Sequence, residues 1–179
     1  MKRYWRELTT REFGAETSHW IAVLPLAATE QHGPHLPVSV DSIIAEGMVE
    51  RCAEALPDEN PTIFLPVQQI GKSNEHINFP GTLTLDWETA IKSWIDIGKG
   101  VARAGARKLV LITSHGGNLS CMDIAARELR EKHNMLVVCT SWEKLGHRSA
   151  IFDQGAVNVD IHGGEAETSI MLAMRPDLV

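Results

Sequence analysis

The chain has 179 residues, of which 44% are hydrophobic and 22% charged, the proportions of a soluble globular protein rather than a disordered one. Lys and Arg number 17 against 23 Asp and Glu, and the formal charge of −6 disfavours nucleic acid or an anionic membrane as a partner. The sequence lacks the run of about 18 apolar residues that a membrane helix needs, and its charged N-terminus lacks a signal-peptide core. We therefore expect one cytoplasmic domain over residues 1–179.

Apolar periodicity predicts strands and helices in alternation along the chain. Short apolar runs of strand length occupy residues 21–26, 62–67, 108–113 and 135–140. Apolar residues at helical spacing follow over residues 41–55, 87–101, 119–133 and 165–174, and a polar loop over 143–163 precedes the last helix. This alternation predicts parallel strands joined by crossover helices on both faces of the sheet. The expected fold is α/β, a three-layer α/β/α sandwich with a mostly parallel central sheet.

Chemically active side chains gather after the predicted strands. Sheets of this kind bind ligands beyond the carboxyl ends of their strands, so these positions are candidates for one common site. In chain order they are Glu30, His32 and His35 after the first strand, His76 after the second, His115 after the third, and His162 before the last helix.

The first of these segments has the spacing of a metal site. Glu30 and His32 are two residues apart, so in an extended segment both side chains point to the same side and can meet one cation or two neighbouring ones. Asp41, at the start of a predicted helix, is a candidate carboxylate bridge between two metal ions. The alternative is that Asp41 is an ordinary helix N-cap.

The third strand and the last helix are each associated with a Gly-Gly pair. Gly116 and Gly117 follow His115 and leave open backbone amides at a helix N-terminus, which suits an anion or an oxyanion. His115 is then either a metal ligand or a loop histidine satisfied by hydrogen bonds. His162 and Glu165 flank the second pair, which lets the backbone approach a site closely. Alternatively, Glu165 is one of the first-turn acids that the helix dipole favours.

Electrostatics favours bound cations at such a site. The carboxylates of Glu30, Asp41 and Glu165 would repel one another if they were brought together without cations between them. Two divalent ions would leave about one positive charge, which a bridging hydroxide balances while serving as a nucleophile. Nitrogen and oxygen ligands without thiolate suit Zn²⁺ or Mn²⁺, and Fe²⁺ as well.

Four segments resemble, in order, the motifs of the creatininase (creatinine amidohydrolase) family. They are residues 24–37 together with Asp41, residues 76–82, residues 114–118 and residues 162–169. The resemblance covers nearly the whole chain from the first strand onward. It implies an α/β/α hydrolase that holds two divalent metal ions, cleaves the C–N bond of a small-molecule amide or cyclic amide, and forms a homo-oligomer, commonly a hexamer. Family members usually extend beyond the length of this chain, which implies a domain shortened at its C-terminus.

The resemblance also implies roles for individual residues. Glu30, Asp41 and His115 would hold one metal ion, while His32, Asp41 and a glutamate of the last motif would hold the other. Ile161 stands where the creatinine-cleaving members have a metal-binding glutamate, so we expect Glu165 to supply this ligand, with Glu167 as the alternative. The general acid/base is expected to be His162, and the residues expected to contact substrate are His76, Gly116, Gly117 and Asn118.

Three functional hypotheses follow. The leading one is a metal-dependent amidohydrolase in which a metal-bridging hydroxide attacks an amide carbonyl. Gly116-Gly117 and Val159 differ from the residues of creatinine-cleaving members, so we expect a substrate other than creatinine. The second hypothesis keeps the metal site but hydrolyses an oxidised sugar or another non-amide bond. The third is a shortened, non-catalytic family member.

Overall fold

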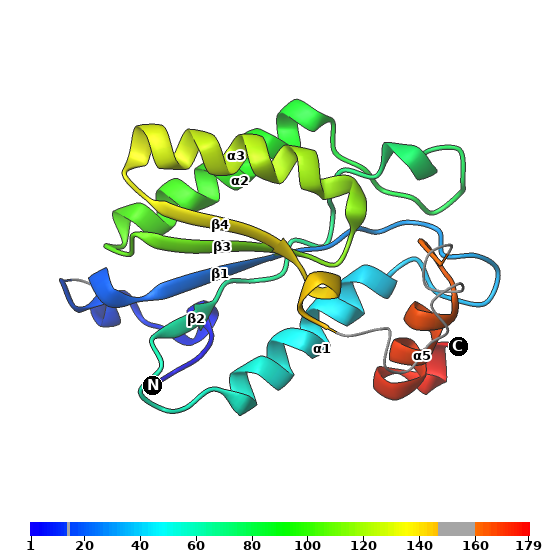
Figure 1. The fold of residues 1–179 in the computed structure, drawn as a ribbon, viewed down its shortest axis with the longest axis horizontal. Coiled ribbons are helices and arrows are strands. Elements are labelled where there is room, and N and C mark those ends of the chain that lie inside the picture. The colour runs from blue at the N-terminus through cyan, green and yellow to red at the C-terminus, as the bar shows by residue number, and fades with distance from the viewer. Residues whose placement is uncertain (14, 147–159) are drawn as a thin grey trace.

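The computed structural model describes residues 1–13, 15–146 and 160–179 (Figure 1). Its centre is a four-stranded sheet in which every pairing is parallel and the strand order is β2-β1-β3-β4. The strands are β1 (Ile21–Leu26), β2 (Thr62–Phe64), β3 (Lys108–Thr113) and β4 (Leu136–Ser141). The predicted parallel sheet is therefore confirmed, with the two longest pairings on either side of β3.

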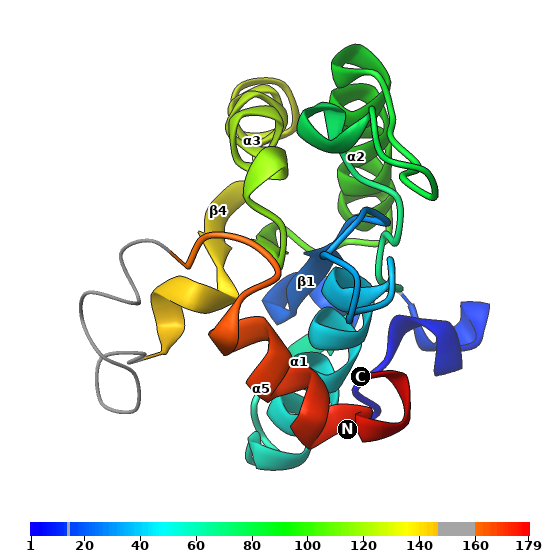
Figure 2. The same ribbon diagram turned by 90° about the vertical axis from the view of Figure 1, so that its right-hand side faces the viewer.

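Helices cover both faces of the sheet. They are α1 (Val40–Ala55), α2 (Trp87–Arg103), α3 (Leu119–His133) and α5 (Glu165–Met174). Figure 2 shows α2 and α3 on one face and α1 with α5 on the other. The predicted three-layer α/β/α architecture is confirmed. None of the helices in the described part of the chain is long and apolar enough to span a membrane.

Alternation along the strands divides the core between the two faces. Leu109 and Leu111 of β3 pack with Trp94 of α2 in the larger apolar cluster, whereas Ile112 packs with Val49 of α1 on the opposite face. Successive side chains of a strand point to opposite faces, so one apolar run can serve both layers. This burial explains why the run over residues 108–113 is apolar nearly throughout.

Short 3₁₀ helices complete the fold. Two of them lie in loops beside the predicted site residues, η4 (Asn74–His76) and η5 (Gly116–Asn118). The others are η1 (Trp5–Glu7), η2 (Thr10–Glu12), η3 (Ala15–His19), η6 (Trp142–Leu145) and η8 (Pro176–Leu178). Residues 147–159 of the predicted polar loop over 143–163 lie outside the described residues.

The topology brings distant segments to one edge of the sheet. Because β1, β2 and β3 run parallel, the loops that follow them leave from the same edge. Helix α5 packs against α1, where Met171 is buried beside Leu36, Val40 and Ile44. The last motif therefore lies next to the start of α1 and the loop after β1.

Candidate metal centre

Glu30 and His32 form the buried floor of the site. Neither Glu30 nor His32 exposes more than 1% of its surface. Both carboxylate oxygens of Glu30 and the Nε2 atom of His32 lack a hydrogen-bond partner among the described residues. The Nδ1–H group of His32 donates to the backbone carbonyl of Glu30 at 3.1 Å, which fixes the tautomer and leaves a lone pair on Nε2.

Asp41 lies between two histidines. Helix α1 begins at Val40 with Ser39 as its N-cap, so Asp41 lies inside the first turn and the N-cap alternative is wrong. Its side chain is 1% exposed. Its Oδ1 atom is 3.8 Å from His32 Nε2, and its Oδ2 atom is 3.8 Å from His115 Nδ1. Each carboxylate oxygen thus faces a different imidazole.

His115 joins the same cluster from the end of β3. Its Nδ1 atom lies 3.0 Å from Glu30 Oε1, while Nε2, on the other edge of the ring, lies 3.0 Å from the carbonyl oxygen of Lys72. The backbone N–H group of His115 donates to Thr113 Oγ1 at 2.9 Å and so orients the loop. The structure brings Glu30, Asp41 and His115 together, as their positions at the edge of the sheet led us to expect.

The last motif contributes Glu167 to the cluster rather than Glu165. Both carboxylates lie in the first turn of α5, and two residues span about 200° around a helix, so they cannot face the same side. The side chain of Glu167 is 13% exposed and its Oε1 atom is 3.9 Å from His32 Nε2. Glu167 also accepts a hydrogen bond from the backbone of Gly163. Glu165 is exposed to solvent and contacts none of the predicted metal ligands.

His76 and His162 cover the cluster as a stacked pair. Their ring centroids are 4.1 Å apart, and each directs one nitrogen towards Glu30 Oε1, at 3.7 Å from His76 Nε2 and 3.6 Å from His162 Nδ1. Gln31 holds both rings. Its side-chain N–H donates to His76 Nδ1 at 2.9 Å, and its backbone carbonyl accepts a hydrogen bond from His162 Nε2.

The predicted substrate-contact residues after His115 differ in their surroundings. Asn118 is fully buried, and its side-chain amide bonds the carbonyl of Ala27, the hydroxyl of Thr113 and the backbone N–H of Lys72. These hydrogen bonds link the segments around Ala27, Lys72 and Thr113, and the Asn118 side chain is not exposed to solvent. Gly116, by contrast, is exposed with open space around it.

Burial and mutual contacts shift the proton affinities of the cluster. Burial raises the pKa of the Asp41 carboxyl well above its usual value and lowers the pKa of His32 to about 4. Burial alone would lower the pKa of His115, but the carboxylates of Glu30 and Asp41 outweigh it and raise that pKa to about 9. No Lys or Arg in the described part of the chain forms an ion pair with Glu30, Asp41 or Glu167.

These donors fit divalent cations. Three sets of three ligand atoms, within 4.8 Å of one another in each set, meet the geometric requirement for a shared ion: Glu30, Asp41 and His115; His32, Asp41 and Glu167; and Glu30, His32 and His162. The first two sets share only Asp41. Buried acceptor atoms without partners are costly unless something satisfies them, and a pair of cations would satisfy those of Glu30, His32 and Asp41.

Comparison with known protein families identifies the family of this chain. The family model described as "Creatininase: Creatinine amidohydrolase" matches residues 6–179. The chain belongs to the creatininase family. The family predicted from the four motifs is therefore confirmed, and the relatives of this chain include an amidohydrolase and a peptidase, which are hydrolases of C–N bonds.

Relatives within the creatininase family differ in their named substrates. The chain is 36% identical to creatinine amidohydrolase of Pseudomonas putida, and the match covers 97% of this chain and 72% of that protein. It is 32% identical to the mycofactocin precursor peptide peptidase of Mycobacterium ulcerans, over 97% of this chain and 66% of that protein. The chain thus spans about two thirds to three quarters of the length of these relatives.

Solved creatininase structures share the fold. One described as "Creatininase Mn" superposes with a TM-score of 0.83 at 34% identity, covering 100% of this chain and 75% of that one. A mutant creatininase described as "Zn-Zn type" has a TM-score of 0.81 at 34% identity and covers the same shares. The family is therefore known with both metals that the donor set favours.

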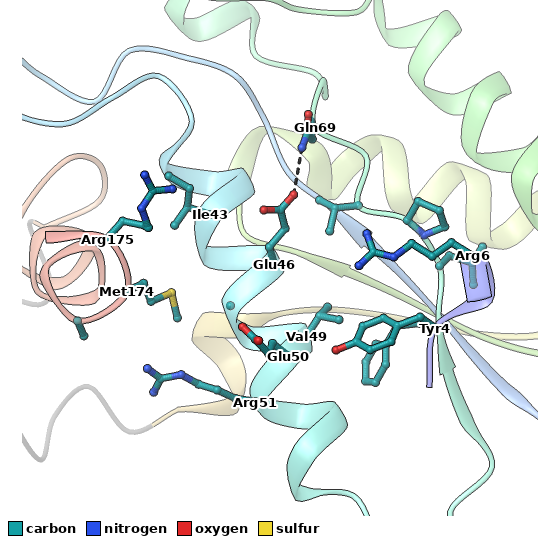
Figure 3. A pocket seen from close by; sticks show the side chains of 16 residues that line it. Tyr4, Arg6, Ile43, Glu46, Val49, Glu50, Arg51, Gln69, Met174 and Arg175 are labelled. Atoms are coloured by element: carbon teal, nitrogen blue, oxygen red, sulfur yellow. Dashed lines mark hydrogen bonds between the residues drawn. The ribbon is translucent and has the colours of Figure 1, made fainter. Parts of the chain in front are cut away.

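This creatininase-family chain also has a cavity away from the cluster, against α1 and β2 (Figure 3). The cavity measures about 660 Å³ and is bordered by Arg6, Arg51 and Arg175 around Glu46 and Glu50. Figure 3 shows the side chain of Gln69 donating to Glu46, at 3.1 Å. None of the clustered histidines and carboxylates lines this cavity, so it is separate from the candidate metal centre.

Proposed function

We propose that this protein is a dinuclear metal-dependent hydrolase that cleaves the C–N bond of a small-molecule amide or cyclic amide. The single observation that carries the proposal is the position of Asp41. Its two oxygens face different histidines, and it belongs to two sets of ligand atoms that share no other member. A carboxylate in that position suits a bridge between two cations.

Each proposed ion has three protein ligands. The first would be held by Glu30, Asp41 and His115, and the second by His32, Asp41 and Glu167. Glu167 takes the place first expected for Glu165 because only Glu167 lies beside His32. Three ligands leave positions open for water and substrate, as catalytic sites require. Zn²⁺ and Mn²⁺ are the proposed ions, and Fe²⁺ suits the same ligands.

The chain's own residues handle protons and orient the substrate. Bound divalent ions would supply Lewis-acid polarisation of the scissile carbonyl and a water of lowered pKa. His162 is the proposed general acid. Its Nε2–H group is held by the carbonyl of Gln31, so Nδ1 points into the site, where it can take up a proton from water and then give that proton to the departing nitrogen. Gly116 and His76 are the proposed substrate contacts, since Gly116 is exposed next to His115 and the His76 side chain, 15% exposed, lies beside Glu30.

Metal analysis of the purified protein tests the site, and turnover tests the chemistry. We expect two equivalents of metal per chain, and hydrolysis of one or more members of a panel of formamides, lactams and cyclic ureides after loading with Zn²⁺ or Mn²⁺. Release of ammonia or an amine separates amide hydrolysis from cleavage of an oxidised sugar or another non-amide bond. Absence of metal uptake would overturn the proposal. Two bound ions without turnover on any substrate would favour the non-catalytic alternative.

The assembly is part of the same proposal. The family resemblance supports a homo-oligomer, with a hexamer as the expected order. Light scattering of the metal-loaded protein measures this directly, and a monomer at micromolar concentration would contradict it.

A further inference from the structure

We propose that Glu75 is a positioning residue that holds the His115 imidazole towards the metal centre. The inference rests on the proposed function, because it assigns His115 as a metal ligand. Glu75 was not among the residues predicted from the sequence. It lies in η4, the single 3₁₀ turn that also carries His76.

The two nitrogens of His115 face opposite surroundings. Nδ1 faces the cluster, 3.0 Å from Glu30 Oε1 and 3.8 Å from Asp41 Oδ2. Nε2 faces away from it, 3.0 Å from the Lys72 carbonyl oxygen and 3.2 Å from Glu75 Oε1. Both outer groups are acceptors, so when a metal ion takes the lone pair of Nδ1 the proton stays on Nε2, next to them. This is the tautomer that a metal ion at the cluster requires.

Glu75 adds a negative charge that the Lys72 carbonyl does not have. The Nε2–H group donates to the Lys72 carbonyl oxygen, and the Glu75 carboxylate lies beside the same nitrogen at ion-pair distance, 3.2 Å. A carboxylate in this outer position makes the ring a stronger metal ligand and fixes its orientation. The neighbouring His76 points towards Glu30 on the other side of the site. Glu75 and His76, which are consecutive in η4, therefore contact two different members of the cluster, His115 and Glu30.

The absence of a side chain at position 117 preserves this arrangement. A Cβ atom on Gly117 would lie 2.6 Å from the Lys72 carbonyl oxygen, and closer still to Glu75 Oε1 and His115 Nε2. A Cβ atom on Gly116 would meet nothing within 4 Å. Of the two adjacent glycines, Gly117 is thus the one that leaves room for both acceptors of His115.

The test measures metal affinity rather than activity. Metal-depleted protein is titrated with Zn²⁺ against a chromophoric chelator, and Co²⁺ absorption reports the ligand field. In Glu75→Ala we expect one of the two ions to bind about 10–100-fold more weakly, with the other unchanged. Glu75→Gln keeps an acceptor oxygen without the charge, and we expect a smaller loss. Glu88→Gln removes one negative charge from the exposed face of α2 and should leave both affinities unchanged.

A second measurement reads the His115 ring directly. Long-range ¹H–¹⁵N spectra of the Zn²⁺-loaded protein report which nitrogen of each histidine carries the proton. We expect one set of His115 signals with the proton on Nε2 in the wild type, and loss of that single set in Gly117→Ala, where both acceptors are displaced. Gly116→Ala is the matched control, and its His115 signals should equal those of the wild type.

The outcomes separate the two proposals. If the wild type binds two ions and Glu75→Ala binds both with unchanged affinity, the role of Glu75 is overturned while the metal centre stands. If the wild type binds no metal ion, the proposed function fails and the role of Glu75 fails with it. If Glu75→Ala does not fold, as judged by circular dichroism, Glu75→Gln and the tautomer measurement decide the role.

Discussion

At the scale of single residues, Asp41 is the carboxylate of the site whose negative charge is most opposed by burial and by neighbouring acids. Its carboxyl is almost completely buried, and burial raises its pKa well above the usual value. Glu30 and Glu167 add to that shift because like charges oppose ionisation. A buried carboxylate in such company is stabilised by cations, which makes Asp41 the most informative position to change.

We expect Asp41→Asn to bind neither metal ion and to lose activity. Asn has nearly the same shape but no negative charge, and it offers a poor bridging oxygen. The substitution leaves the N-cap of α1 unchanged, because that residue is Ser39. The metal-free variant should therefore unfold at the wild-type temperature or above. Elemental analysis and thermal unfolding measure the two effects, and wild-type metal content in Asp41→Asn would exclude the bridging role. His32→Ala, which removes a terminal ligand, should weaken mainly one ion.

The two acids of α5 form a matched pair. Glu167→Gln should lose about one equivalent of metal, since its carboxylate faces His32 at 3.9 Å. Glu165→Gln makes the same chemical change on the exposed side of the same helical turn and should keep both ions. Elemental analysis of the two variants side by side gives the answer. Metal loss in Glu165→Gln alone would restore the original expectation for that residue.

The sequence predicted most residues of the cluster, but not which side of α5 faces it. Glu30, Asp41 and His115 lie together because they follow parallel strands or begin the adjoining helix, and that much follows from the order of elements. Their role as ligands stays a prediction. The choice between Glu165 and Glu167 depends on how α5 is rotated against α1, which is set by packing of Met171 that the local pattern does not encode.

Gln31 and Glu75 were missed for different physical reasons. Strict alternation directs Gln31 away from the side of Glu30 and His32, but the segment is irregular rather than a strand, so Gln31 also reaches His76. Glu75 reaches His115 only because the loop after β2 folds onto the loop after β3. A contact of that kind has no local sequence signal.

At the scale of elements, strand and helix positions were predicted to within a few residues. The second strand ends at Phe64 rather than residue 67. Leu65 still donates to the Val23 carbonyl at 2.8 Å, but Pro25 of β1 has no N–H group to donate back to the second strand. Pairing resumes beyond it, where Gln68 donates to the Pro25 carbonyl at 2.9 Å. Apolar runs identify the buried segments, whereas the ends of a strand depend on backbone hydrogen bonds with its neighbours.

The contact between α2 and α3 gives a prediction for stability. A Cβ atom on Gly98 would lie 2.5 Å from Leu129 Cδ1, and Leu129 is fully buried. Gly98→Ala should cost about 1–3 kcal/mol by overpacking, despite the preference of about 1 kcal/mol for Ala in helices. Gly100→Ala is the control on the same helix, where the nearest atom is 3.6 Å away on Arg103, and it should be neutral or stabilising. Urea unfolding measures both.

A double-mutant cycle then tests the contact itself. Leu129→Ala alone should cost about 2–5 kcal/mol through the cavity it leaves. Combined with Gly98→Ala, the total cost should be smaller than the sum, because the new methyl group fills part of that cavity. Additive costs would show that the two side chains do not compete for the same space.

At the scale of the whole molecule, the candidate site exists only when five segments of the chain are folded together. The loops after β1, β2 and β3 and the start of α5 each contribute a side chain, and α1 contributes Asp41 between them. No local segment carries a complete ligand set. Metal binding to the native state therefore has little counterpart in the unfolded chain, and the binding free energy adds to the stability of the fold.

We expect this linkage to appear as a metal-dependent melting temperature. At a free metal concentration of about 100 times Kd, one bound ion stabilises the native state by about 2.7 kcal/mol. For a chain of this size that corresponds to an increase of about 5–10 °C. The measurement is thermal unfolding of chelator-treated protein with and without added Zn²⁺ or Mn²⁺. Glu165→Gln should show the full increase and Asp41→Asn almost none. An equal increase in Asp41→Asn would mean that the ions stabilise the protein from somewhere other than the cluster around Asp41.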